Sequence, residues 1–321
     1  MNLRPRLSIL AIALLGCSAM ASATESARHN DLDGDGRSDL IWRDSSTGAI
    51  VYWRAADARA GVRLPYNRDL HIWAPVFAMS DFWDDRLKVD VMLETAYGAF
   101  GLLNAFDGHV SAWGDWPSPI VIGHGDFDGN ESADLLSRNP RTGQNQIEFG
   151  ALVGNFIIEG AMYSKQLPTV ALSWKVVGIG DFDGDGRSDI LWRDAITGHD
   201  IIWRSGDTTT RLAIASVTDL DWKVAAIGDY DGDGRSDILW RHARTGANVI
   251  WKSGNMLTPQ AVTTVADTTW MVAATGDFDG DGKWDLLWRN ARTGANVMWK
   301  SAQASARQTL PTVTLNWSLV M

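Results

Sequence analysis

The chain has 321 residues, of which 45% are hydrophobic and 21% charged, a composition that excludes disorder as its main state. It carries 39 acidic and 29 basic residues, a formal net charge of -10. The cationic surface that nucleic acids require is therefore missing, and we expect no nucleic-acid partner. Its 31 glycines, 17 tryptophans and single cysteine predict short aromatic-rich strands joined by tight turns.

The N-terminus has the pattern of a secretory signal peptide. Arg4 and Arg6 precede an apolar stretch over residues 7–16, and a series of small residues follows it. We expect cleavage near Ala21 or Ala23. The apolar stretch is shorter than the roughly 20 residues that a membrane-spanning helix needs, and no later segment approaches that length.

Two outcomes of this N-terminal pattern stay open. Removal of residues 1–23 would leave a single secreted or periplasmic domain over residues 24–321, without a transmembrane segment. Alternatively, residues 14–17 resemble a bacterial lipobox, in which Cys17 is lipidated and anchors the protein to a membrane as a lipoprotein. In either case no thiol remains in the folded domain for disulfides, thiolate metal sites or nucleophilic catalysis, because Cys17 is the only cysteine.

A nine-residue phrase, D-x-D-G-D-G-x-x-D, recurs along the chain and indicates a repeat architecture. Complete copies begin at Asp31, Asp181, Asp229 and Asp277, a weaker copy (DFDGNESAD) begins at Asp126, and a decayed copy begins at Asp81. The starts are separated by 45 to 55 residues. Repeats of this period form the blades of propellers.

Each clear repeat predicts four short strands. In the Asp181 repeat they cover residues 174–180, 189–193, 200–203 and 210–216, as runs of β-branched and aromatic residues bounded by Gly and Asp. The apolar runs are nearly continuous, as expected for small sheets covered on both faces. The sequence therefore predicts an all-β, six-bladed β-propeller of four-stranded antiparallel blades.

The two ends of the chain predict how the ring closes. In complete repeats a Trp lies seven residues before the first Asp, but the Asp31 repeat has no such strand before it. The missing strand is found at residues 317–321, which begin with Trp317. We expect this C-terminal strand to complete the N-terminal blade and so remove the open edges of the ring.

The acidic loops are predicted calcium sites. Counting from the first Asp as position 1, carboxylates stand at positions 1, 3, 5 and 9, and glycines at positions 4 and 6 allow the sharp turn. Ca²⁺ takes six to eight oxygen ligands in irregular geometry and often accepts a backbone carbonyl near position 7. The predicted ligands are the carboxylates of Asp31, Asp33, Asp35, Asp39, Asp181, Asp183, Asp185, Asp189, Asp229, Asp231, Asp233, Asp237, Asp277, Asp279, Asp281 and Asp285, with the backbone carbonyls of Arg37, Arg187, Arg235 and Lys283.

An EF-hand and a metal-free Asp-Gly turn are the two alternatives to a calcium-binding hairpin loop. An EF-hand is rejected because position 12 is Trp in the complete repeats, where that motif requires Glu. Asp-Gly turns also occur in hairpins that bind nothing. However, two carboxylates 4 Å apart repel by about 4 kcal/mol at an effective dielectric of 20, so several converging on one loop favour a bound cation. Mg²⁺ fits less well because it demands a tight octahedron.

The weaker copy leaves the number of ions open at four or five. It keeps oxygen ligands at Asp126, Asp128, Asn130 and Asp134, but Glu131 replaces the glycine at position 6. Whether it binds a metal is undecided. The Asp81 copy has an extra residue and neither glycine, so no ion is expected there.

The segment GDFDGDGRSDILWR from Gly180, followed by Thr197 and Gly198, resembles the FG-GAP/VCBS repeat family. Repeats of this family form the blades of integrin α-subunit propellers and of many secreted bacterial proteins. The resemblance spans essentially the whole chain after residue 23, and it is specific in four units, partial at Asp126 and poor at Asp81. It implies calcium-binding loops between the first and second strands of each blade, but no particular ligand.

No enzyme is expected from these residues. The six histidines lack zinc-site spacing, and the chain has no nucleophile elbow or phosphate-binding glycine loop. Paired carboxylates for cleaving polysaccharides, in a hydrolase or a lyase, stay a minor alternative, since five glutamates could meet in space: Glu25, Glu94, Glu131, Glu148 and Glu159.

The favoured function is a non-catalytic binding or surface-interaction module, monomeric, whose partner is a glycan or an extracellular protein. A lectin-like role is the main alternative, because aromatic rings stack on sugars. Twelve tryptophans recur at fixed offsets and are expected in the core. The candidates for ligand binding are the five irregular ones, Trp284, Trp113, Trp116, Trp73 and Trp83, of which Trp284 at loop position 8 is expected to point to solvent.

Overall fold

The structure is a computed structural model, which describes residues 30–64, 77–79, 90–94, 99–104, 110–115, 120–130, 132–149 and 163–320. The predicted signal peptide, with Cys17, lies outside these residues. Among the described residues, no helix combines the length and the apolar character needed to cross a membrane.

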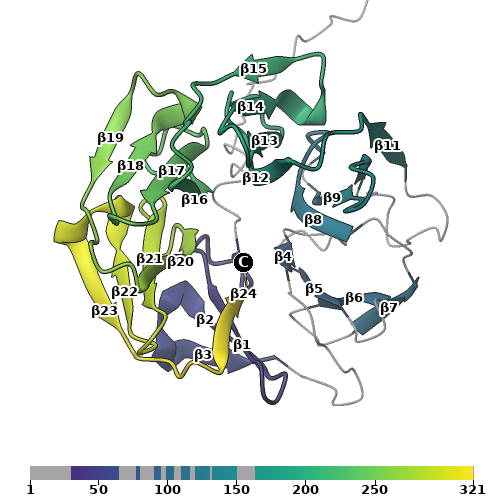
Figure 1. Cartoon of the computed structure of the whole chain (residues 1–321). Coiled ribbons are helices and arrows are strands. Elements are labelled where there is room, and N and C mark those ends of the chain that lie inside the picture. Colours follow the sequence, from purple (N-terminus) through teal and green to yellow (C-terminus); the bar gives the residue numbers. More distant parts are fainter. Residues whose placement is uncertain are drawn as a thin grey trace, which may run out of the picture.

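The strands pair into antiparallel four-stranded sheets that are arranged around a ring (Figure 1). We name each blade that carries an acidic loop after the first Asp of that loop. The Asp31 blade has the order β24-β1-β2-β3, with β1 Leu40–Asp44, β2 Ile50–Trp53, β3 Gly61–Arg63 and β24 Trp317–Val320. The Asp126 blade consists of β8 Ile120–Gly125, β9 Asp134–Arg138, β10 Asn145–Glu148 and β11 Ser164–Leu167.

Three further blades follow one another along the chain with the same strand order. The Asp181 blade consists of β12 Trp174–Gly180, β13 Asp189–Asp194, β14 Asp200–Trp203 and β15 Arg211–Ala213. The Asp229 blade consists of β16 Trp222–Gly228, β17 Asp237–His242, β18 Asn248–Trp251 and β19 Pro259–Val262. The Asp277 blade consists of β20 Trp270–Gly276, β21 Asp285–Asn290, β22 Asn296–Trp299 and β23 Arg307–Leu310.

Short 3-10 turns follow the third strand in four of these blades. They are η1 Arg54–Ala56, η2 Ala58–Ala60, η3 Arg204–Gly206, η4 Lys252–Gly254, η5 Lys300–Ala302 and η6 Ala304–Ala306. In Figure 1 the first strand of each blade lies toward the middle of the ring and the fourth strand lies at its rim.

The structure corrects the predicted number of blades. Five blades carry the acidic loop and the strands of the repeat, so the prediction of a six-bladed propeller is wrong and the repeat builds five blades. The remaining strands, β4 Phe77–Met79, β5 Asp90–Glu94, β6 Ala99–Asn104 and β7 Val110–Asp115, pair into one more sheet. The decayed copy at Asp81 lies outside the described residues. Because it lacks both glycines, its sequence does not encode the turn that joins the first two strands of a repeat blade.

The predicted closure of the ring is confirmed. Strand β24 pairs with β1 in the Asp31 blade, and Trp317 lies opposite Asp44. Trp174 lies opposite Asp194 in the same register of the Asp181 blade. The C-terminal strand therefore takes the place of a first strand, and the Asp31 blade combines three strands from one end of the chain with one from the other.

Tryptophans at positions 12 and 23 form the interior of four blades. The ring centroids in each pair are 5.0 to 5.2 Å apart, for Trp42–Trp53, Trp192–Trp203, Trp240–Trp251 and Trp288–Trp299. The position-12 rings are at most 1% exposed. The prediction of core residues is therefore confirmed at position 12, and at position 23 for Trp203 and Trp299, whereas Trp53 and Trp251 are partly buried and pack against the core.

In four of the repeat blades, an arginine at position 13 contacts the following blade. The guanidinium carbon lies 4.9 to 5.1 Å from the indole centroid of the following blade, in the pairs Arg138–Trp192, Arg193–Trp240, Arg241–Trp288 and Arg289–Trp42. The last of these pairs joins the end of the chain to its beginning. Cation–π contacts therefore run through the described interfaces in one direction around the ring.

Candidate metal centre

The acidic loops bring the carboxylates of positions 1, 3 and 9 together. In each of four loops, one oxygen from each of these side chains lies within 4.8 Å of the other two. These groups are Asp31, Asp33 and Asp39; Asp126, Asp128 and Asp134; Asp181, Asp183 and Asp189; and Asp229, Asp231 and Asp237. The Asp126 loop, whose metal binding was left open from the sequence, thus gathers its three Asp side chains in the same way.

The Asp at position 1 organises the loop backbone. Asp31 accepts hydrogen bonds from the amides of Gly34, Asp35 and Gly36, at donor–acceptor distances of 2.8, 3.1 and 2.8 Å. Gly34 and Gly36 have φ values of 76° and 83°, a conformation that L side chains rarely adopt. The glycines and the first Asp therefore fold the loop around one carboxylate, and the same bonds recur at Asp181, Asp229 and Asp277.

The Asp at position 9 connects the loop with the turn after the third strand. Asp237 accepts one hydrogen bond from the amide of Tyr230 and another from the amide of Ser253, at 3.0 and 2.8 Å. Ser253 has a φ of 48°, which costs free energy in a residue other than glycine. Burial raises the pKa of the position-9 carboxyl to about 7 at Asp39, Asp189, Asp237 and Asp285. A nearby cation would relieve this cost of burying a charge.

The Asp at position 5 stands apart from these groups of three. Its Oδ1 accepts a hydrogen bond of 2.9 Å from the position-7 amide, as Asp35 does from Arg37 and Asp185 from Arg187. The side chain thus stabilises the turn through the position-7 backbone. A ligand role for position 5 and for the position-7 carbonyls stays a prediction.

Each of the four complete loops also has a basic partner that the sequence analysis missed. The residue at position 24 forms an ion pair with the Asp at position 3, in the pairs Arg54–Asp33, Arg204–Asp183, Lys252–Asp231 and Lys300–Asp279. The nitrogen–oxygen distances are 2.9 to 3.1 Å. A basic residue at the same place in four repeats was a signal available in the sequence, but its distance along the chain hid the contact.

The residues present suit a calcium ion. The groups offer carboxylate oxygens alone, which are ligands that Ca²⁺ prefers. In the Asp229 loop the Oδ1 of Asp231 is buried and has no hydrogen-bond partner, while its Oδ2 contacts Lys252. A buried acceptor without a donor is costly, and a cation at the centre of the group would satisfy it.

Hydrogen bonds join the acidic loops of neighbouring blades. The amide at position 8 of one loop donates to the position-1 carbonyl of the preceding blade, in the pairs Ser188–Asp126, Ser236–Asp181, Trp284–Asp229 and Ser38–Asp277. The donor–acceptor distances are 2.6 to 2.8 Å. The five loops therefore form a continuous hydrogen-bonded series that passes from the Asp126 loop to the Asp31 loop.

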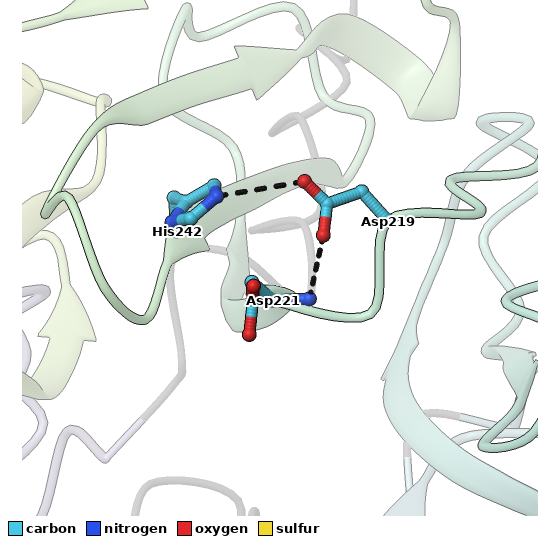
Figure 2. A group of neighbouring side chains, drawn as sticks. All are labelled: Asp219, Asp221 and His242. Atoms are coloured by element: carbon cyan, nitrogen blue, oxygen red, sulfur yellow. Dashed lines mark hydrogen bonds and ion pairs between the residues drawn. The ribbon is translucent and has the colours of Figure 1, made fainter.

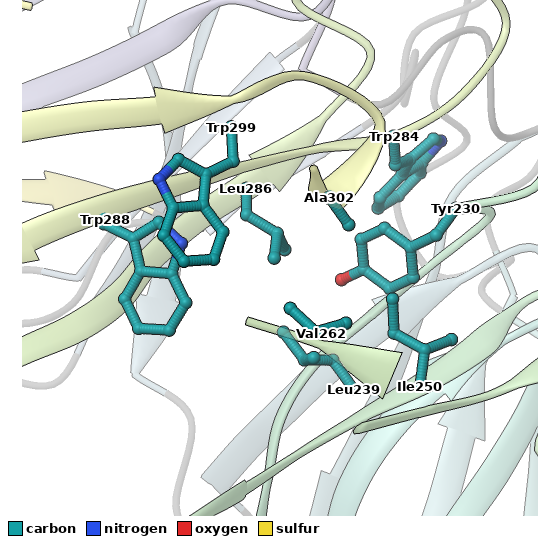
Figure 3. Close-up of a cluster of buried hydrophobic side chains, with 9 residues drawn as sticks. All are labelled: Tyr230, Leu239, Ile250, Val262, Trp284, Leu286, Trp288, Trp299 and Ala302. Atoms are coloured by element: carbon teal, nitrogen blue, oxygen red, sulfur yellow. The ribbon is translucent and has the colours of Figure 1, made fainter. Parts of the chain in front are cut away.

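Trp284 is buried, so the prediction that it points to solvent is wrong. It is 8% exposed and belongs to a core cluster with Tyr230 and Ala302, as Figure 3 shows. A Cβ on Gly228 would lie 2.2 Å from its Cε3, so only glycine allows the indole to lie across the neighbouring strand. Position 8 faces the preceding blade and not the solvent, which the serines of the other loops did not reveal.

The other candidate ligand residues are not brought together by the described part of the structure. Trp113 lies in β7, and Trp73, Trp83 and Trp116 lie outside the described residues. Of the five glutamates considered for catalysis, Glu94 lies in β5 and Glu148 in β10, while Glu25, Glu131 and Glu159 lie outside the described residues.

One further group of possible ligands, Asp219, Asp221 and His242, has a structural explanation (Figure 2). The Nδ1 of His242 accepts hydrogen bonds from the amides of Arg244 and Thr245, both at 3.2 Å. The proton of the neutral ring is therefore on Nε2, which faces Asp219 at 3.5 Å. Since Nε2 has no free lone pair in this tautomer, His242 caps a turn and is not available as a metal ligand.

The Asp126 blade departs from the repeat in its interior. Where the other blades have two tryptophans, it has Ser137 and Glu148, which are 0% and 5% exposed. Ser137 Oγ and Glu148 Oε2 have no hydrogen-bond partner, and burial raises the pKa of Glu148 to about 7. Gln146 donates a hydrogen bond to the other Glu148 oxygen. This blade therefore has a polar interior at the two positions where the other repeat blades have tryptophans.

Comparisons with known proteins support the repeat and the fold. Residues 181–240 and 229–288 each match the family model of the FG-GAP-like repeat. No curated protein matches the sequence. A chain in the crystal structure of a nidogen/laminin complex is similar, with a TM-score of 0.54 and 12% identity over 88% of this chain and 95% of that chain.

A second structural neighbour is a catalytically inactive virginiamycin B lyase from Staphylococcus aureus, crystallised with quinupristin. Its TM-score is 0.50 at 9% identity, and the match covers 90% of each chain. At such identities the likeness shows the fold alone. The chain has the fold of a β-propeller, and its residues 181–288 match the FG-GAP-like repeat.

Proposed function

We propose that this propeller is a secreted, calcium-loaded binding module without catalytic activity, whose partner is an extracellular protein or a glycan. The observation that carries the calcium assignment is the convergence of three Asp side chains in each of four loops. The unpartnered oxygen of Asp231 supports it from within one of these groups. The FG-GAP-like repeats and the propeller fold support binding as the function, while the site that binds must be established on its own.

The residues that would hold the ion are those at positions 1, 3 and 9 of each loop. A bound Ca²⁺ would neutralise their charges and fix the hairpin between the first and second strands. Extracellular calcium modules bind with dissociation constants of about 0.1 to 1 mM, so secretion and metal loading are consistent with each other. Metal binding would then stabilise the folded ring by mass action.

A lectin-like function is the second candidate, but the residue expected to support it most is now part of the core. Trp284 is buried against Tyr230 and cannot stack on a sugar without unfolding its surroundings. Among the described residues, the indoles at positions 12 and 23 pack in pairs inside the blades. Trp284 therefore gives no support to a sugar-binding function.

The calcium assignment is tested by thermal unfolding of the chain from residue 24 with excess Ca²⁺ and with chelator, together with calorimetric titration. We expect four or five ions per chain and a higher melting temperature with Ca²⁺. Asp231→Asn should lower the number of strongly bound ions by one, whereas the control Asp219→Asn, in the turn before β16, should leave it unchanged. Absence of bound ions and of a thermal shift would overturn the calcium part of the proposal.

The binding function needs its own experiment. The immobilised, calcium-loaded protein is probed with laminin-type matrix proteins and with a glycan array, each in the presence of Ca²⁺ and of chelator. Calcium-dependent retention of a protein ligand supports the proposal. Retention of glycans alone would favour the lectin-like alternative, and release of unsaturated or reducing sugar ends from polysaccharides would show an enzyme instead.

A further inference from the structure

The basic residues at position 24 occupy an unusual place beside the acidic loops. Lys252 and Lys300 each begin a 3-10 turn directly after the third strand, and each Nζ lies 2.9 Å from the Oδ2 of the position-3 Asp. Arg54 and Arg204 make the same contact through Nε at 3.1 Å. In four loops, a positively charged side chain of the protein itself therefore contacts the carboxylate cluster.

These ion pairs occupy one oxygen of the position-3 carboxylate, and the other oxygen stays available to a metal ion. In the Asp229 loop, Lys252 contacts Oδ2 of Asp231, whereas Oδ1 is buried without a partner. The Lys side chain is 36% exposed and the Asp side chain 21% exposed, so the ammonium group reaches the cluster from the solvent side. The ammonium and a metal ion could therefore contact the same carboxylate from opposite sides.

The charges of the two cations repel each other. Two unit charges at 4 Å interact by about 1 kcal/mol even in water, and Ca²⁺ carries two charges. In the metal-free loop, by contrast, the basic residue reduces the repulsion among the three carboxylates. The 2.9 Å contacts of Lys252 with Asp231 and of Lys300 with Asp279 place this positive charge directly on the position-3 carboxylates.

We propose that Arg54, Arg204, Lys252 and Lys300 are built-in counter-ions that stabilise the metal-free loops and weaken calcium binding, so that the loops fill only at high calcium concentration. This inference rests on the proposed calcium binding. Each residue sets the affinity of the loop in its own blade through the Asp at position 3. The four complete loops thereby share a device that keeps the ring folded before metal arrives.

The Asp126 loop provides an internal comparison. At position 24 it has Phe149, whose ring stacks on Tyr163 with centroids 5.5 Å apart and an interplanar angle of 20°. No basic side chain of the described residues forms an ion pair with its position-3 residue, Asp128. The proposal therefore separates this loop from the other four, and its metal-free form lacks the stabilisation that they have.

The test compares calcium binding and metal-free stability in the intact mature chain. We expect Lys252→Gln combined with Lys300→Gln to tighten calcium binding at two sites by about tenfold and to lower the melting temperature in chelator. The charge-preserving variant Lys252→Arg with Lys300→Arg should retain the wild-type affinity. Lys175→Gln combined with Lys223→Gln, which removes one exposed lysine each from β12 and β16, is the matched control for net charge.

The outcomes separate this inference from the proposed function. If the wild type binds calcium and the double Gln variant binds with unchanged or weaker affinity, the counter-ion role is wrong and the calcium assignment stands. If neither protein binds calcium in calorimetry, both fail together. If the control Lys175→Gln with Lys223→Gln tightens binding as much as the double variant at position 24, the effect is one of net charge, and the specific role of position 24 is overturned.

Discussion

The guanidinium carbon of Arg289, in the last repeat, lies 5.0 Å from the ring centroid of Trp42, in the first. The contact repeats the geometry of Arg241 on Trp288 inside the ring, where the distance is 4.9 Å. The junction between the two ends of the chain is therefore built like an ordinary interface between blades. It adds a side-chain contact to the backbone pairing of β24 with β1.

Replacing Arg289 should open this junction. Arg289 is 8% exposed and donates hydrogen bonds to the carbonyls of Gly294, Val313 and Trp317. Arg289→Gln leaves several of these acceptors without donors, so we expect unfolding in urea to require about 2 to 4 kcal/mol less free energy. Arg289→Lys should restore little of the lost stability, because an ammonium group cannot reproduce the planar set of hydrogen bonds that the guanidinium group donates.

The interface inside the ring gives the matched comparison for this prediction. Arg241→Gln removes the equivalent contact on Trp288 without touching the closure of the ring. If both variants lose similar stability, the junction is as strong as the other interfaces. A loss below about 0.5 kcal/mol for Arg289→Gln would show that β24 closes the ring without help from this side chain.

Trp284 should behave as a core residue. Trp284→Ser introduces the residue found at this position in the Asp31, Asp181 and Asp229 loops, and we expect it to cost about 3 to 5 kcal/mol of folding stability because the indole is buried. Chemical denaturation of both proteins measures the difference. A cost near zero would restore Trp284 as a surface residue.

Asp237→Asn should separate the two roles of a position-9 carboxylate, which are to accept backbone hydrogen bonds and to bind calcium. Its two carboxylate oxygens accept hydrogen bonds from the backbone N–H groups of Tyr230 and Ser253. An Asn side chain has a single oxygen and can accept only one of these hydrogen bonds. We expect about 1 kcal/mol of lost stability even in chelator, and the loss of one calcium ion in calorimetry. A variant that keeps every ion would remove position 9 from the ligand set.

Glu148 should make stability depend on pH. Its pKa is raised to about 7 by burial, so between pH 4.5 and 7 the unfolded chain releases a proton that the folded chain keeps. Stability from this group therefore falls as pH rises through that window, and the full cost, about 3 kcal/mol, is present above pH 7. Glu148→Gln should remove this slope.

The measurement for Glu148 is the difference in unfolding free energy between wild type and Glu148→Gln, in chelator, from pH 4.5 to 8. We expect the two proteins to be similar at the acidic end and the variant to be more stable at the alkaline end. A constant difference across the range would contradict the raised pKa.

The repeat phrase was enough to predict the strands and the closure of the ring. The glycines at positions 4 and 6 and the apolar runs after position 9 are local signals, and β12 covers residues 174–180 as expected. The location of Trp317 also predicted its pairing partner. The decayed copy at Asp81 has none of these signals, and for that reason the number of repeat blades was overestimated.

For the candidate metal site, the sequence predicted only the contacts within a single loop. The convergence of positions 1, 3 and 9 follows from one loop, so residues within nine positions revealed it. The contact of Lys252 with Asp231 and the packing of Trp284 on Gly228 join residues that are 21 and 56 positions apart. Such contacts depend on how hairpins and blades pack, which local periodicity does not encode.

The hydrogen bonds from position 8 of one loop to position 1 of the preceding one make the loops a single belt around one side of the ring. Each such bond ends on the backbone of a residue that would hold an ion. Filling one loop should therefore change how readily its neighbour accepts an ion, and damage to two adjacent loops should cost a different amount from damage to two distant ones. The unit on which calcium acts would then be the belt and not the individual hairpin.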